Sequence, residues 1–384
     1  MDADTLLDAA RDLAPTLRER ARQTELDREV PAATIKELQE AGLFRALQPR
    51  RFGGYELPPM AFYDTTMELA AACGSTGWVY GVVGVHAWQL ALLPEKTQEE
   101  VWGGDSSTLV SSSYAPTGCV EPTEGGYRVR GRWNFSSGCG HCRWALLGGI
   151  VVTDGVPDHV TFLLPDSDYS IEDVWHVTGL SGTGSNDVVV EDAFVPARRA
   201  QSTMGTLGGA GIHSSPLYQL PFASVFCNAI GAATIGIAVG AVEAYREYTL
   251  ERVRVAYGGE KAAGDPFSQV RLAEAAGDLD DARTQLRRNM DELMELAEAG
   301  QEIPEALRIR IRRDQVRASR AAMQATDRVF ESAGGKALFL DKPIQRAWRD
   351  VHAARVHAIN DIERGLLIYG AHALGGAVPP GSMI

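Results

Sequence analysis

The chain is poor in cysteine, in positive charge and in long apolar runs, and each shortage excludes a class of protein. Five of its 384 residues are cysteine, an odd number without framework spacing, so we expect a reducing compartment rather than a disulfide scaffold. The 50 acidic residues outnumber the 37 basic ones, which gives a formal net charge of −13. A negative surface repels nucleic acid and anionic lipid, so neither is expected as a partner.

Targeting and membrane signals are also missing. Residues 1–30 alternate acids, arginines and leucines without the apolar core of a signal peptide. We expect no later apolar run to reach the roughly 18 residues that span a bilayer. These absences predict a cytoplasmic protein without a membrane segment. The content of 45% hydrophobic and 23% charged residues is that of a soluble globular chain.

The periodicity of the chain runs from helical to β-rich and back to helical. Apolar residues recur at helical spacing from Leu6 to about Gly104, and helical patterns return from Phe222 onward. The strand signals between them lie at 127–130, 144–147, 159–164 and 187–190. This order predicts an α+β fold with three domains. They are an N-terminal helical domain at 1–108, a central β-barrel or sandwich domain at 109–205 and a C-terminal four-helix bundle at 206–384.

Three glycine or cysteine patterns invite a functional interpretation but favour a structural one. Cys139 and Cys142 have C-x-x-C spacing, yet no second pair and no βαβ pattern accompanies them, so we expect no metal site. The glycines of 179–184 follow neither a dinucleotide nor a P-loop spacing and favour a bending loop. Gly231, Gly236 and Gly240 are spaced for close packing of a helix face.

The run Trp133-Asn134-Phe135-Ser136-Ser137-Gly138 combines two aromatic rings with two adjacent hydroxyls. Aromatic faces that cover a ring and a few placed hydroxyls that orient it are typical of a pocket for a flat cofactor. The alternative is an ordinary strand end before a glycine turn, with both rings in the core.

A second cluster lies near the C-terminus, where His357 and Asp361 are four residues apart. In a helix they would share one face, and the carboxylate would orient the ring and favour its charged form. The alternative is a partly exposed surface pair. His352 and His372 have no evident partner in the sequence.

Separate blocks along the chain together resemble the acyl-CoA dehydrogenase fold from end to end. They are 133–138, 180–196, Gly334-Gly335 and Arg349-Asp350. More narrowly, the blocks 73–78, 84–86, 111–116 and 348–361 are similar to those of two-component flavin-dependent monooxygenases. That family hydroxylates phenols, among them steroid-derived phenols and p-hydroxyphenylacetate.

The resemblance leaves a dehydrogenase as the main alternative. Dehydrogenases of this fold often place a catalytic Glu nine residues after an Arg equivalent to Arg349, and this register gives His357-Ala358-Ile359. Without that base, proton abstraction loses a contribution of roughly 10²- to 10⁴-fold. A Glu from another helix would keep a dehydrogenase possible, and a non-catalytic flavin-fold binding protein is a third interpretation.

The resemblance implies an oxygenase component that receives reduced FMN or FAD from a separate NAD(P)H:flavin reductase. Reaction with O2 would give a C4a-hydroperoxyflavin, which hydroxylates a small aromatic substrate ortho to its phenol. The substrate would be a steroid-derived phenol, a polyketide or an indole, and the loop 201–216 would shape that choice. A homotetramer, in which helices of one subunit complete the cofactor site of another, is also implied.

The resemblance further assigns residues. Catalytic roles fall to Ser137, beside flavin N5, and to His357, oriented by Asp361 next to the peroxide. Substrate contacts are expected from His86 and Tyr114. The expected flavin contacts, with Arg252 at the phosphate, are Trp78, Ser111, Ser112, Ser113, Phe135, Ser136, Ser137, Arg252, Gly335, His357 and Ala358.

Overall fold

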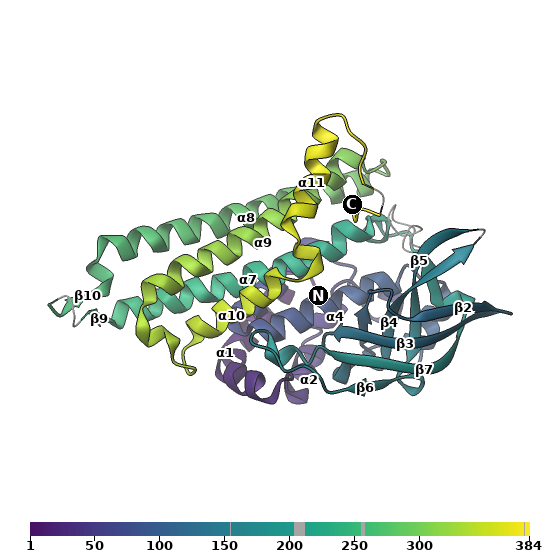
Figure 1. Ribbon diagram of the computed structural model, residues 1–384, viewed down its shortest axis with the longest axis horizontal. Coiled ribbons are helices and arrows are strands. Elements are labelled where there is room, and N and C mark those ends of the chain that lie inside the picture. The colour runs from purple at the N-terminus through teal and green to yellow at the C-terminus, as the bar shows by residue number, and fades with distance from the viewer. Residues whose placement is uncertain (154, 203–211, 255–257, 380) are drawn as a thin grey trace.

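The structure, a computed structural model, describes residues 1–153, 155–202, 212–254, 258–379 and 381–384. Helices, two β-sheets and a long helical bundle follow one another along the chain, and the sheets pack against one end of the helical part (Figure 1). The first helices are α1 (Ala3–Asp27), α2 (Ala32–Glu40), α3 (Pro59–Ala72), α4 (Gly74–Leu90) and α5 (Glu95–Trp102). The expected α+β architecture is confirmed.

Helix α4 is the helix that positions much of the site. Its residues are apolar on nearly every side, which is the pattern of a helix surrounded by protein. Both Trp78 and His86, eight residues apart on α4, are buried. At a rise of about 1.5 Å per residue, their Cα atoms lie about 12 Å apart along the axis.

The β part is a sandwich of two four-stranded sheets. The first sheet has the order β1 (Val110–Ser113), β4 (Trp144–Thr153), β5 (Val156–Pro165) and β8 (Ala200–Ser202). The second has the order β2 (Cys119–Thr123), β3 (Gly126–Ser136), β7 (Asn186–Pro196) and β6 (Ser170–Glu172). Strands β1 and β4 are parallel and the other pairs are antiparallel. All four strand signals read from the sequence fall within these strands.

The bundle contains α7 (Phe222–Glu251), α8 (Pro266–Glu298), α9 (Glu305–Ala333), α10 (Pro343–Arg355) and α11 (Ile362–Ala373). A short hairpin of β9 (Val253–Arg254) and β10 (Glu260–Lys261) closes the far end (Figure 1). Helix α7 is long and apolar enough to cross a membrane, so the expectation that no run reaches that length is wrong. Because 89% of its most apolar window is buried inside the protein, α7 is the core helix of the bundle.

The expected close packing at the α7 glycines is confirmed. A Cβ at Gly236 would lie 2.5 Å from the Met67 carbonyl oxygen, and one at Gly240 would lie 2.3 Å from that of Ala71, both on α3. Only glycine lets the two helices approach this closely. At Gly236 and Gly240 this face is therefore covered by α3 of the same chain.

The division at residues 108 and 205 stays a prediction. The boundary at 205 and residues 203–211 of the loop expected to shape substrate choice lie outside the described residues. The fold nevertheless brings the end of β3 against α4. A Cβ at Gly138 would lie 2.9 Å from Val79 Cγ1, so the β3 turn is seated directly on this helix.

Candidate active site

Three predicted residues from distant parts of the sequence meet around the indole of Trp78. The Trp78 Nε1–H donates to Ser137 Oγ at 3.2 Å. The ring also lies edge-on to His357, with 5.6 Å between ring centroids. Helix α4, the end of β3 and the turn after α10 thus converge, so that Ser137 and His357 both contact one buried tryptophan.

The imidazole of His357 is held in one tautomer. The backbone N–H of Ile359 donates to His357 Nδ1 at 3.2 Å, so Nδ1 is the acceptor and the ring hydrogen is on Nε2. Burial, with a smaller contribution from the nearby Arg312 guanidinium, lowers the pKa of His357 to about 4. His357 is therefore neutral near pH 7 and presents an N–H donor.

The expected pairing of Asp361 with His357 is wrong. The two residues are not in one helix, because His357 precedes a 3-10 turn (Ala358–Asn360) and Asp361 follows it. The Asp361 carboxylate accepts from the Arg364 backbone N–H at 3.1 Å and pairs with the Arg364 side chain, so it caps α11. The charged imidazolium that the sequence suggested is replaced by a neutral ring.

The turn that carries His357 is fixed by buried polar contacts from α9. Arg312 Nη1 donates to the Ile359 carbonyl at 2.7 Å. The fully buried Asn360 accepts from Gln315 Nε2 at 2.7 Å and from Ser319 Oγ at 2.8 Å. A turn tied down this strongly holds its imidazole in a fixed position.

The second predicted histidine, His86, has the opposite tautomer. His86 Nδ1 lies 2.9 Å from the Val110 carbonyl oxygen, which can only accept, so Nδ1 carries the hydrogen. Its Nε2 is buried and has no hydrogen-bond partner among the described residues. Burial lowers the pKa of His86 to about 4, so the ring is neutral and Nε2 is a free acceptor.

Aromatic rings surround His86. Phe226 of α7 stacks on it at 6.3 Å between centroids, and Tyr114 meets it edge-on at 6.2 Å. Tyr114 also contacts Phe226 and Phe222 edge-on, and its hydroxyl donates to Gln89. Burial raises the pKa of Tyr114 well above its usual value, so it stays a neutral phenol. The surroundings of His86 are therefore aromatic and apolar.

The serines predicted to contact flavin differ in their surroundings. Ser111 and Ser136 are buried, and their hydroxyls have no hydrogen-bond partner among the described residues. Ser113 is also buried but donates to the Asn134 carbonyl at 2.6 Å, while Ser112 is half-buried. Buried polar atoms without partners are costly and call for a ligand. A flat ligand rich in heteroatoms, such as a flavin, fits these residues.

The two aromatic rings of 133–138 lie in different surroundings. Trp133 is fully buried in the sandwich core and donates to the Gly148 carbonyl at 2.7 Å, so it is not a cofactor wall. Phe135 is 67% exposed and meets Trp175 edge-on. Its φ of +66° lies in the left-handed region, a strained conformation for a bulky side chain that clusters at functional sites.

Arg252 and Gly335 lie apart from this centre. Arg252 donates to the Ser332 carbonyl at 2.9 Å, next to Gly334, and Gly335 is exposed. Ser332, to which Arg252 is bonded, and Gly335 lie before the start of α10, whereas His357 follows its end. A helix of 13 residues is about 20 Å long. Ala358 is exposed on the turn after His357. The predicted flavin contacts thus form two groups within one chain.

The cysteine pair is structural. Cys139 and Cys142 are buried, and their thiols contact the carbonyls of Gly184 and Gly138. Burial raises the pKa of both thiols, which keeps them protonated and unreactive. Among the described residues, no group of three or more His, Cys, Asp or Glu side chains is placed to hold a metal.

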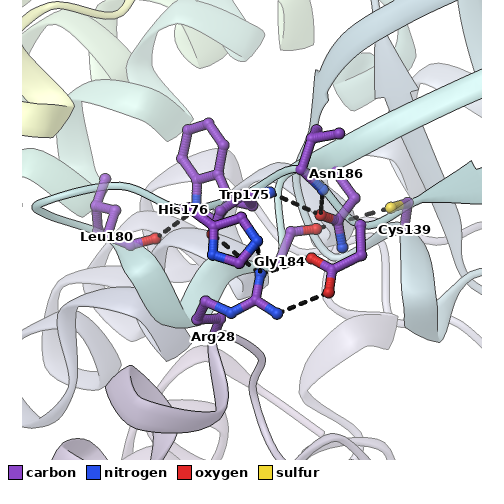
Figure 2. Close-up of polar contacts among 9 residues, drawn as sticks. Arg28, Cys139, Trp175, His176, Leu180, Gly184 and Asn186 are labelled. Carbon is purple, nitrogen blue, oxygen red and sulfur yellow. Dashed lines mark hydrogen bonds and ion pairs between the residues drawn. The ribbon is translucent and has the colours of Figure 1, made fainter.

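The loop between β6 and β7 is locked beside Ser137. Figure 2 shows Arg28 reaching toward His176, and the Trp175 indole donating to the Leu180 carbonyl at 3.0 Å. The Asn186 side chain accepts from the Trp175 backbone N–H at 3.1 Å. A Cβ at Gly179 would lie 2.1 Å from the Arg349 carbonyl oxygen, which explains the glycine without a phosphate.

A hollow in the protein surface lies next to α2 and α4. Residues of these two helices and of 106–110 line it, among them Gln39, Val83 and Ala87. Its lining contains none of the predicted site residues.

Sequence reasoning missed several partners. Phe226 and Gln89 complete the surroundings of His86 and Tyr114, and Ser185 bonds to Ser137. His352, which seemed to lack a partner, lies 2.9 Å from the Asp327 carboxylate. Asp327 is 25 positions away, so no local pattern reveals the pair.

Comparison with known proteins defines the class. The chain matches the family of the acyl-CoA dehydrogenase N-terminal domain over residues 2–105 and that of the C-terminal domain over residues 228–362. The fold is therefore that of the acyl-CoA dehydrogenases, as the resemblance implied.

More specific relatives are flavin-dependent monooxygenases. The chain is 50% identical over 368 residues to the oxygenase subunit HsaA of Rhodococcus jostii (strain RHA1), covering 94% of this chain and 96% of that one. It is 37% identical over 359 residues to the FADH2-dependent resorcinol hydroxylase, oxygenase component, of Rhizobium sp. (strain MTP-10005), covering 90% and 88%. The crystal structure of the Mycobacterium tuberculosis HsaA monooxygenase superimposes with a TM-score of 0.94 at 47% identity and full coverage of both chains.

This chain belongs to the family of flavin-dependent monooxygenase oxygenase subunits built on the acyl-CoA dehydrogenase fold. It is an enzyme that uses flavin, and the monooxygenase interpretation of the sequence is confirmed over the dehydrogenase one.

Proposed function

We propose that this chain takes reduced flavin from a separate reductase and hydroxylates a phenol at the carbon ortho to its hydroxyl. The words "oxygenase subunit" and "oxygenase component" in the names of its relatives support a two-component system. A steroid-derived phenol is the first candidate substrate, because the sequence blocks resemble oxygenases of such phenols and similar solved structures include 3-HSA hydroxylase and HsaA. A polyketide phenol is the second.

The free Nε2 atom of His86 carries this proposal. Within the part of the chain that the structure describes, it is a buried acceptor without a partner, on a ring that contacts Phe226 and Tyr114. A phenol O–H that donates to it satisfies the atom and gains electron density on the ring, where the ortho carbon is the nucleophile. Because the pKa of His86 is about 4, the ring polarises the hydroxyl rather than storing its proton.

Reduced flavin, when bound, would supply the two electrons that activate O2, and O2 would supply the oxygen atom that is transferred to the phenol. Both Ser137 and His357 contact the Trp78 indole, which supports a role for both at the reacting part of the flavin. The His357 Nε2–H donates to developing negative charge, and the buried surroundings of Trp78 exclude water from it. Ser111 and Ser136 have free hydroxyls for the polar edge of the ring system.

The carboxylates near His357 are engaged in structural contacts. Asp350 is buried and accepts from the Leu180 backbone N–H, and Asp361 caps α11. Burial raises the pKa of Asp350 to about 6. Neither is placed as the base that α-proton abstraction from an acyl thioester requires.

We also propose a cytoplasmic homotetramer in which the bundle of one subunit supplies Arg252 and Gly335 to the flavin site of another. All five cysteines are free, which suits a reducing compartment. The separation of Arg252 from His357 along α10 suits a shared site. Leu338, Phe339 and Leu340, all more than 60% exposed, lie directly before α10 and would be covered in such an assembly.

Anaerobic mixing tests the function. The protein is loaded with photoreduced flavin, then mixed with O2 and with a steroid-derived phenol, resorcinol or p-hydroxyphenylacetate, and the products are identified by mass. We expect a catechol from at least one phenol and peroxide without a phenol. Tightly held oxidised flavin that is bleached by an acyl-CoA would contradict the proposal and favour a dehydrogenase.

A further inference from the structure

We propose that the buried hydroxyls of Ser185 and Thr183 fix the direction of the Ser137 hydroxyl and thereby make the site prefer reduced flavin over oxidised flavin. The inference rests on the proposed placement of Ser137 beside flavin N5. It adds two positioning residues and a binding preference to that placement.

The hydroxyls form one continuous chain. Ser137 Oγ lies 2.7 Å from Ser185 Oγ, and Ser185 Oγ lies 2.7 Å from Thr183 Oγ1. Thr183 Oγ1 lies 2.8 Å from the Leu180 carbonyl oxygen, where the chain ends. Ser185 and Thr183 are 3% and 1% exposed, so water does not compete for these bonds.

Counting hydrogens gives the chain a single direction. A carbonyl oxygen can only accept, so the one hydrogen of Thr183 is used on Leu180. Ser185 must then donate to Thr183, and Ser137 must donate to Ser185. The Trp78 Nε1–H has no acceptor capacity and donates to Ser137. Ser137 is left with one free lone pair and no free hydrogen.

Leu180, the acceptor at the end of this hydroxyl chain, is held in place by further bonds. Its carbonyl also accepts from the Trp175 indole, as Figure 2 shows. The Leu180 backbone N–H donates to Asp350 Oδ1 at 2.6 Å. Leu180 has a φ of +53°, a conformation that a non-glycine residue keeps only when its surroundings impose it. The terminal acceptor is therefore fixed in place, and the direction of the chain with it.

A fixed acceptor distinguishes the two redox states of flavin. N5 of reduced flavin carries a hydrogen and donates, whereas N5 of oxidised flavin has a lone pair and accepts. Ser137 can receive the N5–H of reduced flavin in its free lone pair. Toward oxidised flavin it presents one lone pair to another, and its hydrogen is held by Ser185.

Loss of either partner hydroxyl frees the hydrogen of Ser137. In Ser185→Ala, Ser137 has no acceptor to hold its hydrogen and can donate to oxidised N5. One neutral hydrogen bond corresponds to about three- to tenfold in affinity. We expect oxidised flavin to bind Ser185→Ala about three- to tenfold more tightly, and reduced flavin to bind nearly as it does to the unchanged protein. A merely structural loss would weaken both.

The experiment measures dissociation constants for oxidised flavin in air and for photoreduced flavin under anaerobic conditions, on the full-length protein. Thr183→Val removes the end of the chain and is expected to lower the reduced-to-oxidised preference, whereas Thr183→Ser restores the hydroxyl and the preference. Thr117→Val is the matched control, because its exposed hydroxyl also donates to a carbonyl, that of Arg132, on the β sandwich. Melting temperatures establish that each variant is folded.

The outcomes separate this inference from the proposed function. A changed preference in Ser137→Ala, Ser185→Ala and Thr183→Val, with Thr183→Ser and Thr117→Val unchanged, supports both. A change in Ser137→Ala alone overturns the directed chain and leaves the flavin placement standing. If Ser137→Ala also keeps the preference, Ser137 does not contact N5 and the placement itself fails. If Ser185→Ala does not fold, the two Thr183 variants decide.

Discussion

The two histidines of this site are alike in charge and opposite in hydrogen-bonding role. His86 and His357 both have a pKa of about 4, chiefly because the surrounding protein desolvates both rings. His86 gives its hydrogen to the Val110 carbonyl and presents a lone pair, whereas His357 receives the Ile359 N–H and presents a hydrogen. One backbone contact on Nδ1 decides which role each ring has.

One residue type could therefore serve two partners in the proposed function. His86 would provide the acceptor that a phenol hydroxyl needs. His357 would provide the donor that the oxygen activated by flavin needs. Neutrality makes both roles possible near pH 7, because an imidazolium has two donors and no acceptor.

The largest effect is expected from His86→Asn. The amide can still donate toward Val110, but it puts no acceptor where Nε2 stands, so we expect hydroxylation to fall by about 100-fold or more. His86→Gln, whose amide oxygen reaches the Nε2 position, should restore substrate binding and little of the rate. The measurements are kcat and KM with the identified phenol. Equal rates for His86→Asn and the unchanged enzyme would remove His86 from the mechanism.

Removal of the donor at His357 should uncouple the reaction rather than stop flavin use. A hydrogen bond to a charged group corresponds to about 1.5 to 3 kcal/mol, which is roughly 10- to 100-fold. In His357→Ala we expect flavin affinity within a fewfold of normal and a product yield per flavin at least tenfold lower, with peroxide as the balance. His357→Gln retains an N–H donor and is the matched control. Unchanged coupling in His357→Ala would contradict the donor role.

Arg312 links the turn to the charge state of His357, and its effect should be smaller. Its guanidinium both lowers the pKa of His357 and holds the Ile359 carbonyl. In Arg312→Met we expect the pKa of His357 to rise, so that coupling declines at a higher pH than in the unchanged enzyme. Arg312→Lys keeps the charge and serves as the control. The same pH profile in both variants would show that the charge does not act on His357.

The free energy of unfolding should depend on pH because the pKa of His86 differs between the folded and unfolded protein. The unfolded His86 side chain binds a proton near pH 6.5, whereas the folded one does so near pH 4. Stability is therefore unaffected above about pH 6.5 and is lost as pH falls toward 4, by about 2 kcal/mol at pH 5 for this one residue. His86→Gln should lose less stability between pH 7 and 5 in urea unfolding. Asp350, whose pKa is raised, acts in the opposite direction but is common to both proteins.

The fold could be predicted from the sequence because its elements have regular periodicity. Alternating residues such as those of β3 and β7, and the small-residue face of α7, report local packing directly. Trp133 lies on the inward face of β3 with Val129, so it belongs to the core, whereas the bulge between Trp133 and Ser136 leaves Phe135 exposed. A helix was assumed across His357 and Asp361, but the 3-10 turn between them separates their side chains.

The site could be predicted only in part, because the hydrogen-bond partners of its residues come from distant segments of the sequence. Ser137, Trp78, His86 and His357 were expected from the resemblance, and the structure joins three of them. The tautomers depend on the carbonyl of Val110 and the N–H of Ile359, which no side-chain pattern records. Thr183 appeared only within the glycine-rich stretch 179–184, and Ser185 only within the block 180–196.

Nitrogen-15 NMR of the protein labelled at its eight histidines measures the charge and the tautomer of each imidazole. His86→Gln and His357→Gln identify the two signals. At pH 6 we expect both rings to be neutral, His86 with its hydrogen on Nδ1 and His357 with its hydrogen on Nε2. Two rings in the same tautomer, or either ring doubly protonated at that pH, would contradict this expectation.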